Sequence, residues 1–276
     1  MRQLLFLALF ILCVGMAVAQ PSLTTNPNAV PGTFVVREVI HPLAPQQITQ
    51  NVDPNMLVGG TSFACSGAGI TTDNHVWRLF DLDDDHGLLN TLTVASLDYG
   101  IETAVGPTQN ITATMYCLDE GLPFQLEFLT QVGTSTQPQP DAELEFFNIA
   151  VGGSCDTASQ DLAVDMSTED CLAGEADCLS LFIGANDLGQ SGPTYVHADD
   201  CGIFDPIDTV ALGFFSMHIV YAVNGEADGG GPQDGGGDGG DGGPDPVPAS
   251  TGVGVILLVL LLGGSIAYFM RRRTTS

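Results

Sequence analysis

The chain of 276 residues holds 33 acidic residues, six arginines and no lysine, and its formal net charge is −27. A field of that sign repels nucleic acid, anionic lipid and acidic polysaccharide unless divalent cations bridge them, so direct nucleic-acid binding is excluded as a role. Between the two ends only Arg37 and Arg78 are basic, which against 33 acidic residues leaves the middle of the chain near 2 − 33 = −31.

The N-terminal sequence MRQLLFLALFILCVGMAVAQ predicts a secretory signal peptide over residues 1–19. Arg2 precedes an apolar run, and Ala17 and Ala19 form the A-x-A pattern that signal peptidase recognises. We expect cleavage between Ala19 and Gln20 and export of the remaining chain. An uncleaved N-terminal anchor is the weaker alternative, because the apolar run is short and a cleavage pattern follows it.

The cysteine content agrees with export. Cys13 leaves with the signal peptide, and the even number that remains favours disulfides in an oxidising compartment. The candidates are Cys65, Cys117, Cys155, Cys171, Cys178 and Cys201. Sequence cannot choose among their fifteen pairings, but four cysteines between positions 155 and 201 predict at least one local bridge. A zinc site is less favoured, because Cys171 and Cys178 lack C-x-x-C spacing and no histidine pair lies nearby.

Hydrophobic periodicity predicts an all-β ectodomain. Residues 20–32 are polar and proline-rich and predict a loose leader, whereas residues 33–225 are long enough for one domain with a sizeable core. Within this domain the apolar period is two: in NITATMYCL, for example, Ile111, Ala113 and Met115 share one face. Short strands separated by Gly, Pro and Asp clusters are typical of an antiparallel β-sandwich or jelly roll.

Particular segments carry this pattern. Strands are expected at residues 75–82, 91–101, 110–118, 124–129, 142–151, 178–183 and 217–223. Turns are expected at DDDHG, VGPTQN, DEGLP, STQPQPD and LGQSGP. Residues 161–177 have a poor pattern that is compatible with a single turn of helix.

The densest acidic cluster is DLDDDHG, which begins at Asp81. Asp81, Asp83 and Asp85 alternate as in calcium loops, and calcium accepts hard oxygen ligands in irregular geometry. However, His86 stands where the sharp turn needs glycine, and no glutamate occupies the twelfth position. A solvated turn at a strand end is therefore the favoured interpretation, and a calcium site is the alternative.

The sequence contains no recognisable catalytic motif. It lacks G-x-S-x-G, H-E-x-x-H and any close histidine pair, so we expect a protein that is not an enzyme. A carbohydrate-binding module, or a glycan-active enzyme on a β-sandwich, is the alternative function. A module of that kind needs exposed aromatic platforms, for which Trp77 and Tyr195 are the candidate residues, with core packing favoured for Trp77.

The run that begins at Gly184 resembles the C-terminal part of β-sandwich modules in secreted bacterial surface proteins. Those modules carry G-x-N-x-x-G-Q-x-x-P-x-Y before a single Cys-Gly. The positions that match here are Gly184, Asn186, Gly189, Gln190, Pro193, Tyr195, Cys201 and Gly202. The resemblance implies a sandwich fold and an extracellular location, and it implies no activity.

The C-terminal part predicts a spacer followed by a membrane span. Residues 226–246 are glycine and aspartate with a few prolines, which is typical of a disordered linker. Residues 252–270 are uncharged and long enough for a transmembrane helix. The arginines that follow, Arg271, Arg272 and Arg273, place this end in the cytoplasm, so we expect a type I single-pass precursor.

The tail resembles the IPTL-type and PEP-type sorting signals of bacterial exosortase systems, over residues 247–276. Val247 and Pro248 match the apolar-Pro start of the I-P-x-x-x-x-W-G motif, and Gly254 matches its glycine, but the aromatic residue is missing. The resemblance implies cleavage by an exosortase-like membrane enzyme, and a sortase signal is the runner-up. An ordinary membrane anchor is the simpler alternative, in which the helix is retained.

These observations together predict an exported protein at the cell surface or outer envelope. Its expected role is structural or adhesive, with exopolysaccharide or other envelope components as partners. Signal peptidase and an exosortase-like enzyme are the expected processing partners. No cofactor is expected, except calcium if the acidic turn binds it.

Overall fold

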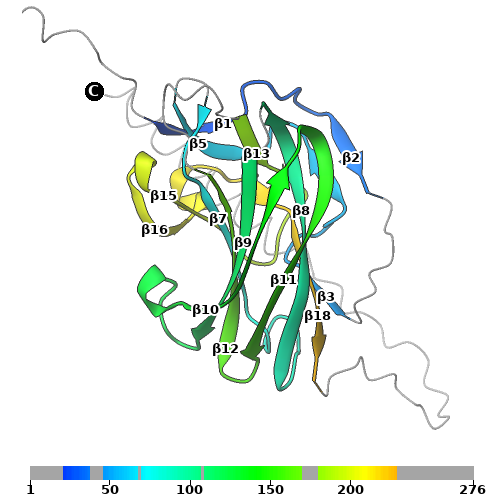
Figure 1. Ribbon diagram of the computed structural model, residues 1–276, viewed down its shortest axis with the longest axis vertical. Helices are drawn as coiled ribbons and strands as arrows, with labels where there is room; N and C mark the ends of the chain where they lie inside the picture. Colours follow the sequence, from blue (N-terminus) through cyan, green and yellow to red (C-terminus); the bar gives the residue numbers. More distant parts are fainter. Residues whose placement is uncertain (1–20, 38–45, 68–69, 107–108, 170–179, 229–276) are drawn as a thin grey trace, which may run out of the picture. The chain divides into compact units, whose positions relative to one another are not determined.

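The computed structural model describes residues 21–37, 46–67, 70–106, 109–169 and 180–228 (Figure 1). The described chain consists of antiparallel strands and three short 3-10 turns, without an α-helix, which confirms the all-β prediction. Figure 1 shows the two longest strands, β8 and β11, running side by side, as their antiparallel pairing requires. The two largest sheets pack face to face as a sandwich around one core.

The first of these sheets has six strands in the order β10-β9-β12-β7-β15-β16. Their bounds are Thr130–Gln139 for β10, Gln109–Asp119 for β9, Gln160–Thr168 for β12, His75–Phe80 for β7, Thr194–Ala198 for β15 and Ile203–Asp208 for β16. Edge strand β10 contains Pro138, which cannot donate a ladder hydrogen bond and is tolerated at an edge.

The second sheet has the order β11-β8-β18-β3, with β13 also paired to β8. Its strands are Ala142–Asp156 for β11, Thr91–Val105 for β8, Tyr221–Ala227 for β18, Gln46–Ile48 for β3 and Ser180–Ile183 for β13. Bulges interrupt β11 between Ala150 and Gly153 and β10 between Gln131 and Gly133. The two bulges meet so closely that a Cβ on Gly133 would overlap the carbonyl oxygen of Gly152.

Three small sheets accompany the two large ones. They are formed by β1 (Ser22–Thr25), β5 (Phe63–Gly67) and β6 (Ile70–Thr71), by β2 (Phe34–Val36) and β4 (Met56–Val58), and by β14 (Ala185–Asn186) and β17 (His218–Ile219). The 3-10 turns are η1 (Leu126–Phe128), η2 (Asp199–Cys201) and η3 (Thr209–Leu212). Strand β1 lies within the predicted loose leader and pairs with β5, so the ordered domain begins earlier than the composition indicated.

The core follows from the two-residue period of the strands. From the six-stranded sheet Val76, Met115 and Val164 point inward, and Tyr99 and Ile149 meet them from the other sheet. All five side chains are at most 1% exposed, so their neighbours on each strand must face outward.

Two disulfides are formed among the described residues. Cys117–Cys155 joins β9 to β11 across the sandwich, and Cys65–Cys201 joins β5 to η2. Neither is the local bridge expected between positions 155 and 201. Cys171 and Cys178 lie outside the described residues.

Two local predictions were wrong, and a third, the helical turn within residues 161–177, falls partly on residues 170–177, which lie outside the described residues. Residues 124–129 alternate like a strand but form a loop with η1, because Phe124 folds onto aromatic side chains of the sheet. Residues 161–168 belong to the central strand β12 rather than to a helical turn, with Leu162, Val164 and Met166 in the core. The expected turn STQPQPD lies largely within β10.

The predicted ends of the chain lie outside the description. The signal peptide, most of the 226–246 linker and the sorting signal at 247–276 are among the residues not described. Across the described ranges, no helix has the length and hydropathy needed to cross a bilayer. The predicted span at 252–270 is not part of those ranges.

Candidate functional site

The side of the six-stranded sheet turned away from the core is the candidate site, and we call it the outer face. Residues on it alternate with core residues along each strand. They include His75, Trp77, Thr112, Thr114, Tyr116, Asp165, Ser167, Tyr195 and His197. Trp77 lies opposite Asp165 on one neighbouring strand and opposite Tyr195 on the other. The two candidate aromatic residues of the sequence analysis are therefore cross-strand neighbours.

A row of histidine and aspartate side chains crosses this face. The Nδ1 atom of His75 lies 2.7 Å from Oδ2 of Asp165, and its Nε2 atom lies 3.3 Å from Oδ1 of Asp73. The ring of His197 lies 5.0 Å from the ring of His75, and its Nε2 atom lies 3.0 Å from Oδ1 of Asp199. Strands β7, β12 and β15 bring these groups together from distant parts of the sequence.

The protonation of this row follows from its geometry. Burial lowers the pKa of His75, but hydrogen bonds and charge from Asp165 and Asp73 outweigh burial and raise that pKa to about 10. Burial raises the pKa of Asp165, and the hydrogen bond and charge of His75 oppose this shift. The hydrogen bond to His75 also lowers the pKa of Asp73. At neutral pH, His75 is thus a cation held between two carboxyl groups.

Aromatic rings form the other half of the outer face. The Trp77 ring lies 5.4 Å from Tyr116 and meets Phe124 edge-on at 5.8 Å, and Phe124 meets Tyr195 edge-on at 4.7 Å. Trp77 is 1% exposed, whereas the three surrounding rings are half-buried. Trp77 thus packs as expected for a buried residue, but in an aromatic cluster on the outer face rather than in the sandwich core.

Several buried polar atoms of this face have no hydrogen-bond partner among the described residues. They are Trp77 Nε1, Asp165 Oδ1 and His197 Nδ1. Buried polar atoms in native proteins are nearly always satisfied, because leaving one unpaired costs about 1–3 kcal/mol. One indole donor, one carboxylate oxygen and one imidazole nitrogen therefore lie closed off from solvent beneath this face without a partner among the described residues.

Hydroxyl groups extend the face toward the edge strand. The hydroxyls of Thr112 and Thr136 lie 2.9 Å apart, and those of Thr114 and Thr134 lie 3.2 Å apart. Such cross-strand threonine pairs stabilise an antiparallel sheet and keep its surface polar. The outer face therefore combines rings, charged groups and hydroxyls on a rigid support.

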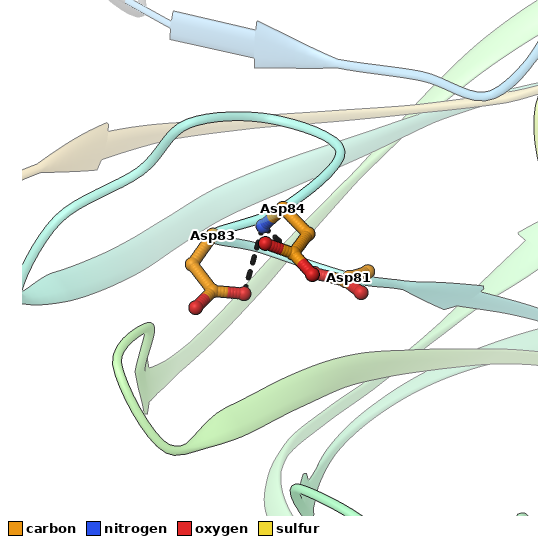
Figure 2. A group of neighbouring side chains, drawn as sticks. All are labelled: Asp81, Asp83 and Asp84. Carbon is orange, nitrogen blue, oxygen red and sulfur yellow. Dashed lines mark hydrogen bonds between the residues drawn. The ribbon is translucent and has the colours of Figure 1, made fainter.

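The acidic turn after β7 brings carboxylates together in a different way from the predicted one. Oxygen atoms of Asp81, Asp83 and Asp84 lie within 4.8 Å of one another, and Asp85 is not in this group (Figure 2). The backbone N–H of Asp84 donates to Asp81 Oδ1 at 3.0 Å, so the chain turns here and alternate residues do not share a face. The turn therefore brings Asp84, rather than the predicted Asp85, beside Asp81 and Asp83.

Further carboxylates crowd the same turn. Burial, followed by the charges of Asp81 and Glu120, raises the pKa of Asp161 to about 6. Burial likewise raises the pKa of Asp81. Mutual repulsion of this kind is relieved when a cation binds.

The Gly184 run serves the architecture of the sandwich. Its Gln190 accepts a hydrogen bond from Arg78 at 2.6 Å, and the carbonyl of Gly192 accepts another at 2.8 Å. Arg78 is fully buried, and burial lowers its pKa to about 9. Asn186 donates to the carbonyl of Asp53, which ties the run to the loop before β4. These bonds tie the run to β7 and to the loop before β4.

The glycine-rich loop before β5 is also structural. Ser62 is fully buried, and its backbone N–H, with those of Gly60 and Thr61, donates to the carboxylate of Glu102. Glu102 also accepts from Asn26 at 2.7 Å. The loop therefore holds a carboxylate of its own chain.

Comparisons with known proteins provide no match. No protein-family model, curated protein or solved structure matches the chain.

The sequence analysis had singled out Trp77 and Tyr195 of this face. It had not singled out Asp165, His75, His197 or Phe124. The period of two in DLAVDM was the signal that could have placed Asp165 on the face opposite Leu162 and Val164.

Proposed function

We propose that the chain is an exported, non-catalytic protein of the cell surface or outer envelope, and that its outer face adheres to polysaccharide. This proposal joins the expected adhesive role to the alternative of a carbohydrate-binding module. The observation that carries it is the cluster of half-buried Tyr116, Phe124 and Tyr195 on the same face as the exposed hydroxyls of Thr112 and Thr136. Binding sites typically pair an apolar or aromatic surface with a few placed polar groups.

The chemistry of the face suits a sugar. The C–H faces of a pyranose ring pack on aromatic rings, which the half-buried Tyr116, Phe124 and Tyr195 offer, while its hydroxyls can bond to the exposed hydroxyls of Thr112 and Thr136. The charge of −27 disfavours acidic polymers, so a neutral or cationic polysaccharide is the expected ligand.

The contacts of His75 support binding rather than catalysis at that residue. A general base must have a free ring nitrogen facing the proton that it removes. Both nitrogens of His75 already face carboxylates, and its raised pKa keeps it protonated at neutral pH. His75 is therefore suited to holding Asp165 in place.

Export and sorting are supported by the ends of the sequence and by the cysteines. Two disulfides fit an oxidising compartment. The signal peptide, linker and tail fit display outside the membrane after processing by signal peptidase and an exosortase-like enzyme. Protease digestion of intact cells that express the full chain tests this topology, and a protected sandwich domain would refute it.

A glycan array with the full chain tests adhesion. We expect Phe124→Ala or Tyr195→Ala to weaken binding to a glycan that the wild type binds on the array by about tenfold or more. Phe34→Ala is the matched control, because Phe34 is 61% exposed and lies on β2, outside the outer face. Equal loss in the control, or binding that is unchanged in both outer-face variants, would refute the site.

We propose that the acidic turn after β7 binds a calcium ion. Three clustered carboxylates and the raised pKa of Asp161 support it. Titration calorimetry of the full chain should show calcium binding that Asp83→Asn weakens and Asp141→Asn leaves unchanged. Equal heats in the two variants would contradict this assignment.

A further inference from the structure

Trp77 is buried although it lies on the side of the sheet that is turned away from the core. Its side chain is 1% exposed, and the rings of Tyr116 and Phe124 lie 5.4 and 5.8 Å from its own ring. Tyr116 belongs to strand β9, whereas Phe124 comes from the loop between β9 and β10. We call residues 121–128 the cover loop, because through Phe124 they cover an aromatic ring that the sheet would otherwise present on its surface.

The cover loop is bound to the sheet through side chains rather than through its backbone. The N–H groups of Leu122 and Phe128 each donate to the carbonyl oxygen three residues earlier. Within the described ranges, no hydrogen bond joins residues 121–128 to another part of the sandwich, and none of these residues is buried. A segment with few buried contacts and no hydrogen bonds to its support opens at a low cost in free energy.

Two polar atoms beside the covered ring await partners. Trp77 Nε1 is a donor and Asp165 Oδ1 is an acceptor, and neither has a hydrogen-bond partner among the described residues. Trp77 and Asp165 stand directly opposite each other on β7 and β12, and each is 1% exposed. Because an unpaired buried polar group is costly, a ligand that supplies both an acceptor and a donor here gains affinity.

The surroundings of Asp165 are short of positive charge. Two carboxyl groups, those of Asp73 and Asp165, face the single imidazolium of His75. Neither arginine of the described ranges serves this face, because Arg37 is paired with an aspartate of the other sheet and Arg78 is fully buried. A ligand that brings a positive charge is therefore favoured, and the faces of aromatic rings attract cations as well.

We propose that the cover loop lifts to admit one amino-sugar ring of a cationic polysaccharide between Phe124 and Trp77. The inference rests on the proposed adhesion of the outer face and names the sugar and the subsite. The C–H faces of the sugar pack on the two aromatic side chains, its ammonium group bonds to Asp165 Oδ1, and a hydroxyl oxygen accepts from Trp77 Nε1. A neutral sugar offers the C–H faces and hydroxyls but lacks the charge.

Opening of the loop can be measured without any ligand, because Trp77 is the only tryptophan of the chain. Gly121 begins the cover loop with a φ of 76°, which alanine disfavours, so Gly121→Ala disfavours the closed loop. In the full chain, held in a polyoxyethylene detergent that carries neither sugar nor amine, this variant should increase acrylamide quenching of Trp77 fluorescence up to about fivefold. Gly213→Ala is the matched control, because Gly213 has a φ of 95° and, as at Gly121, a Cβ would meet nothing within 4 Å.

Three oligosaccharides of the same linkage test the choice of sugar, at a pH at which the amine is protonated. They are a glucosamine oligomer, its N-acetylated form and a glucose oligomer. The glucosamine oligomer should cause a saturable shift in Trp77 emission, and the other two should bind about tenfold or more weakly, because they lack the charged donor. Asp165→Asn should narrow the difference between the glucosamine and glucose oligomers. If circular dichroism shows that this variant does not fold, the comparison of the three oligomers with the wild type decides.

Several results would overturn the proposal. Equal quenching of the wild type and Gly121→Ala would show that the loop does not open, and equal affinity for the three oligomers would refute the amino sugar. Binding of the glucosamine oligomer on an array without any change in Trp77 emission would overturn the subsite and leave adhesion to the outer face standing. Failure of every glycan to bind would refute the proposed adhesion itself and this inference with it.

Discussion

Replacing His75 with glutamine tests the charged row of the outer face. Asp165 keeps only 2% of its side-chain surface exposed, and His75 is its cationic partner at 2.7 Å. Removing one partner of a buried ion pair leaves an uncompensated charge and typically costs about 3–5 kcal/mol. Since a quarter of the His75 side chain is exposed, solvent screens part of the interaction, and we expect about 3 kcal/mol at pH 6.

The stabilisation that His75 provides should depend on pH. The pKa of His75 rises from an ordinary 6.5 to about 10 on folding, so folding favours the protonated form. This stabilisation is fully present below pH 6.5 and is lost as the pH rises through 10. The pKa difference corresponds to at most about 5 kcal/mol, which screening reduces to about 3 kcal/mol.

Urea unfolding at several pH values between 6 and 10 measures this loss. The free energy of unfolding of the wild type should fall toward that of His75→Gln as the pH rises. His86→Gln is the matched control, because burial lowers rather than raises the pKa of His86. Parallel curves for the wild type and His75→Gln would refute the stabilising pair, whatever other groups titrate in this range.

Three further predictions concern the stability of the sandwich. Gly133→Ala should lower the free energy of unfolding in urea by about 1–3 kcal/mol, because the added Cβ would overlap the carbonyl oxygen of Gly152. Gly152→Ala is the control: a Cβ on Gly152 meets nothing within 4 Å, so this variant should change the urea midpoint little. Arg78→Met should lower the free energy of unfolding by about 3 kcal/mol or more, because it leaves several buried carbonyl groups without donors. Thermal unfolding measures this loss, and a melting temperature within about one degree of the wild type would contradict the role of Arg78. Replacing Cys117 and Cys155, which are 38 positions apart, with serine should cost about 4 kcal/mol, and an unchanged urea midpoint would argue against this disulfide.

The sequence was most informative where one face of a strand is apolar. The alternation in residues 110–118 placed Ile111, Ala113 and Met115 in the core, and β9 confirms it. It misled at residues 124–129, because Phe124 finds its apolar surroundings on the outer face rather than in the core. An apolar period of two shows that alternate residues are buried, but it does not show that they form a strand. A loop whose apolar side chains pack on aromatic rings can have the same alternation.

The candidate site could be predicted only in part. Trp77 and Tyr195 were chosen as aromatic residues and proved to be neighbours on adjacent strands. Asp165 was one of 33 acidic residues, and nothing near it in the sequence indicates a histidine partner 90 positions away. Pairing of β12 with β7 creates that contact, and pairing of this kind depends on the register of the whole sheet.

The sequence by itself determined the fold class and the strongly negative charge, because strand periodicity and composition are local properties that survive in any tertiary arrangement. It also carries the predictions of export and sorting, which rest on short segments at the two ends. Only the tertiary structure decided which cysteines pair, which aspartates meet in the acidic turn and which rings surround Trp77. Each of those contacts joins strands or backbone turns whose geometry depends on the packing of two sheets around one core.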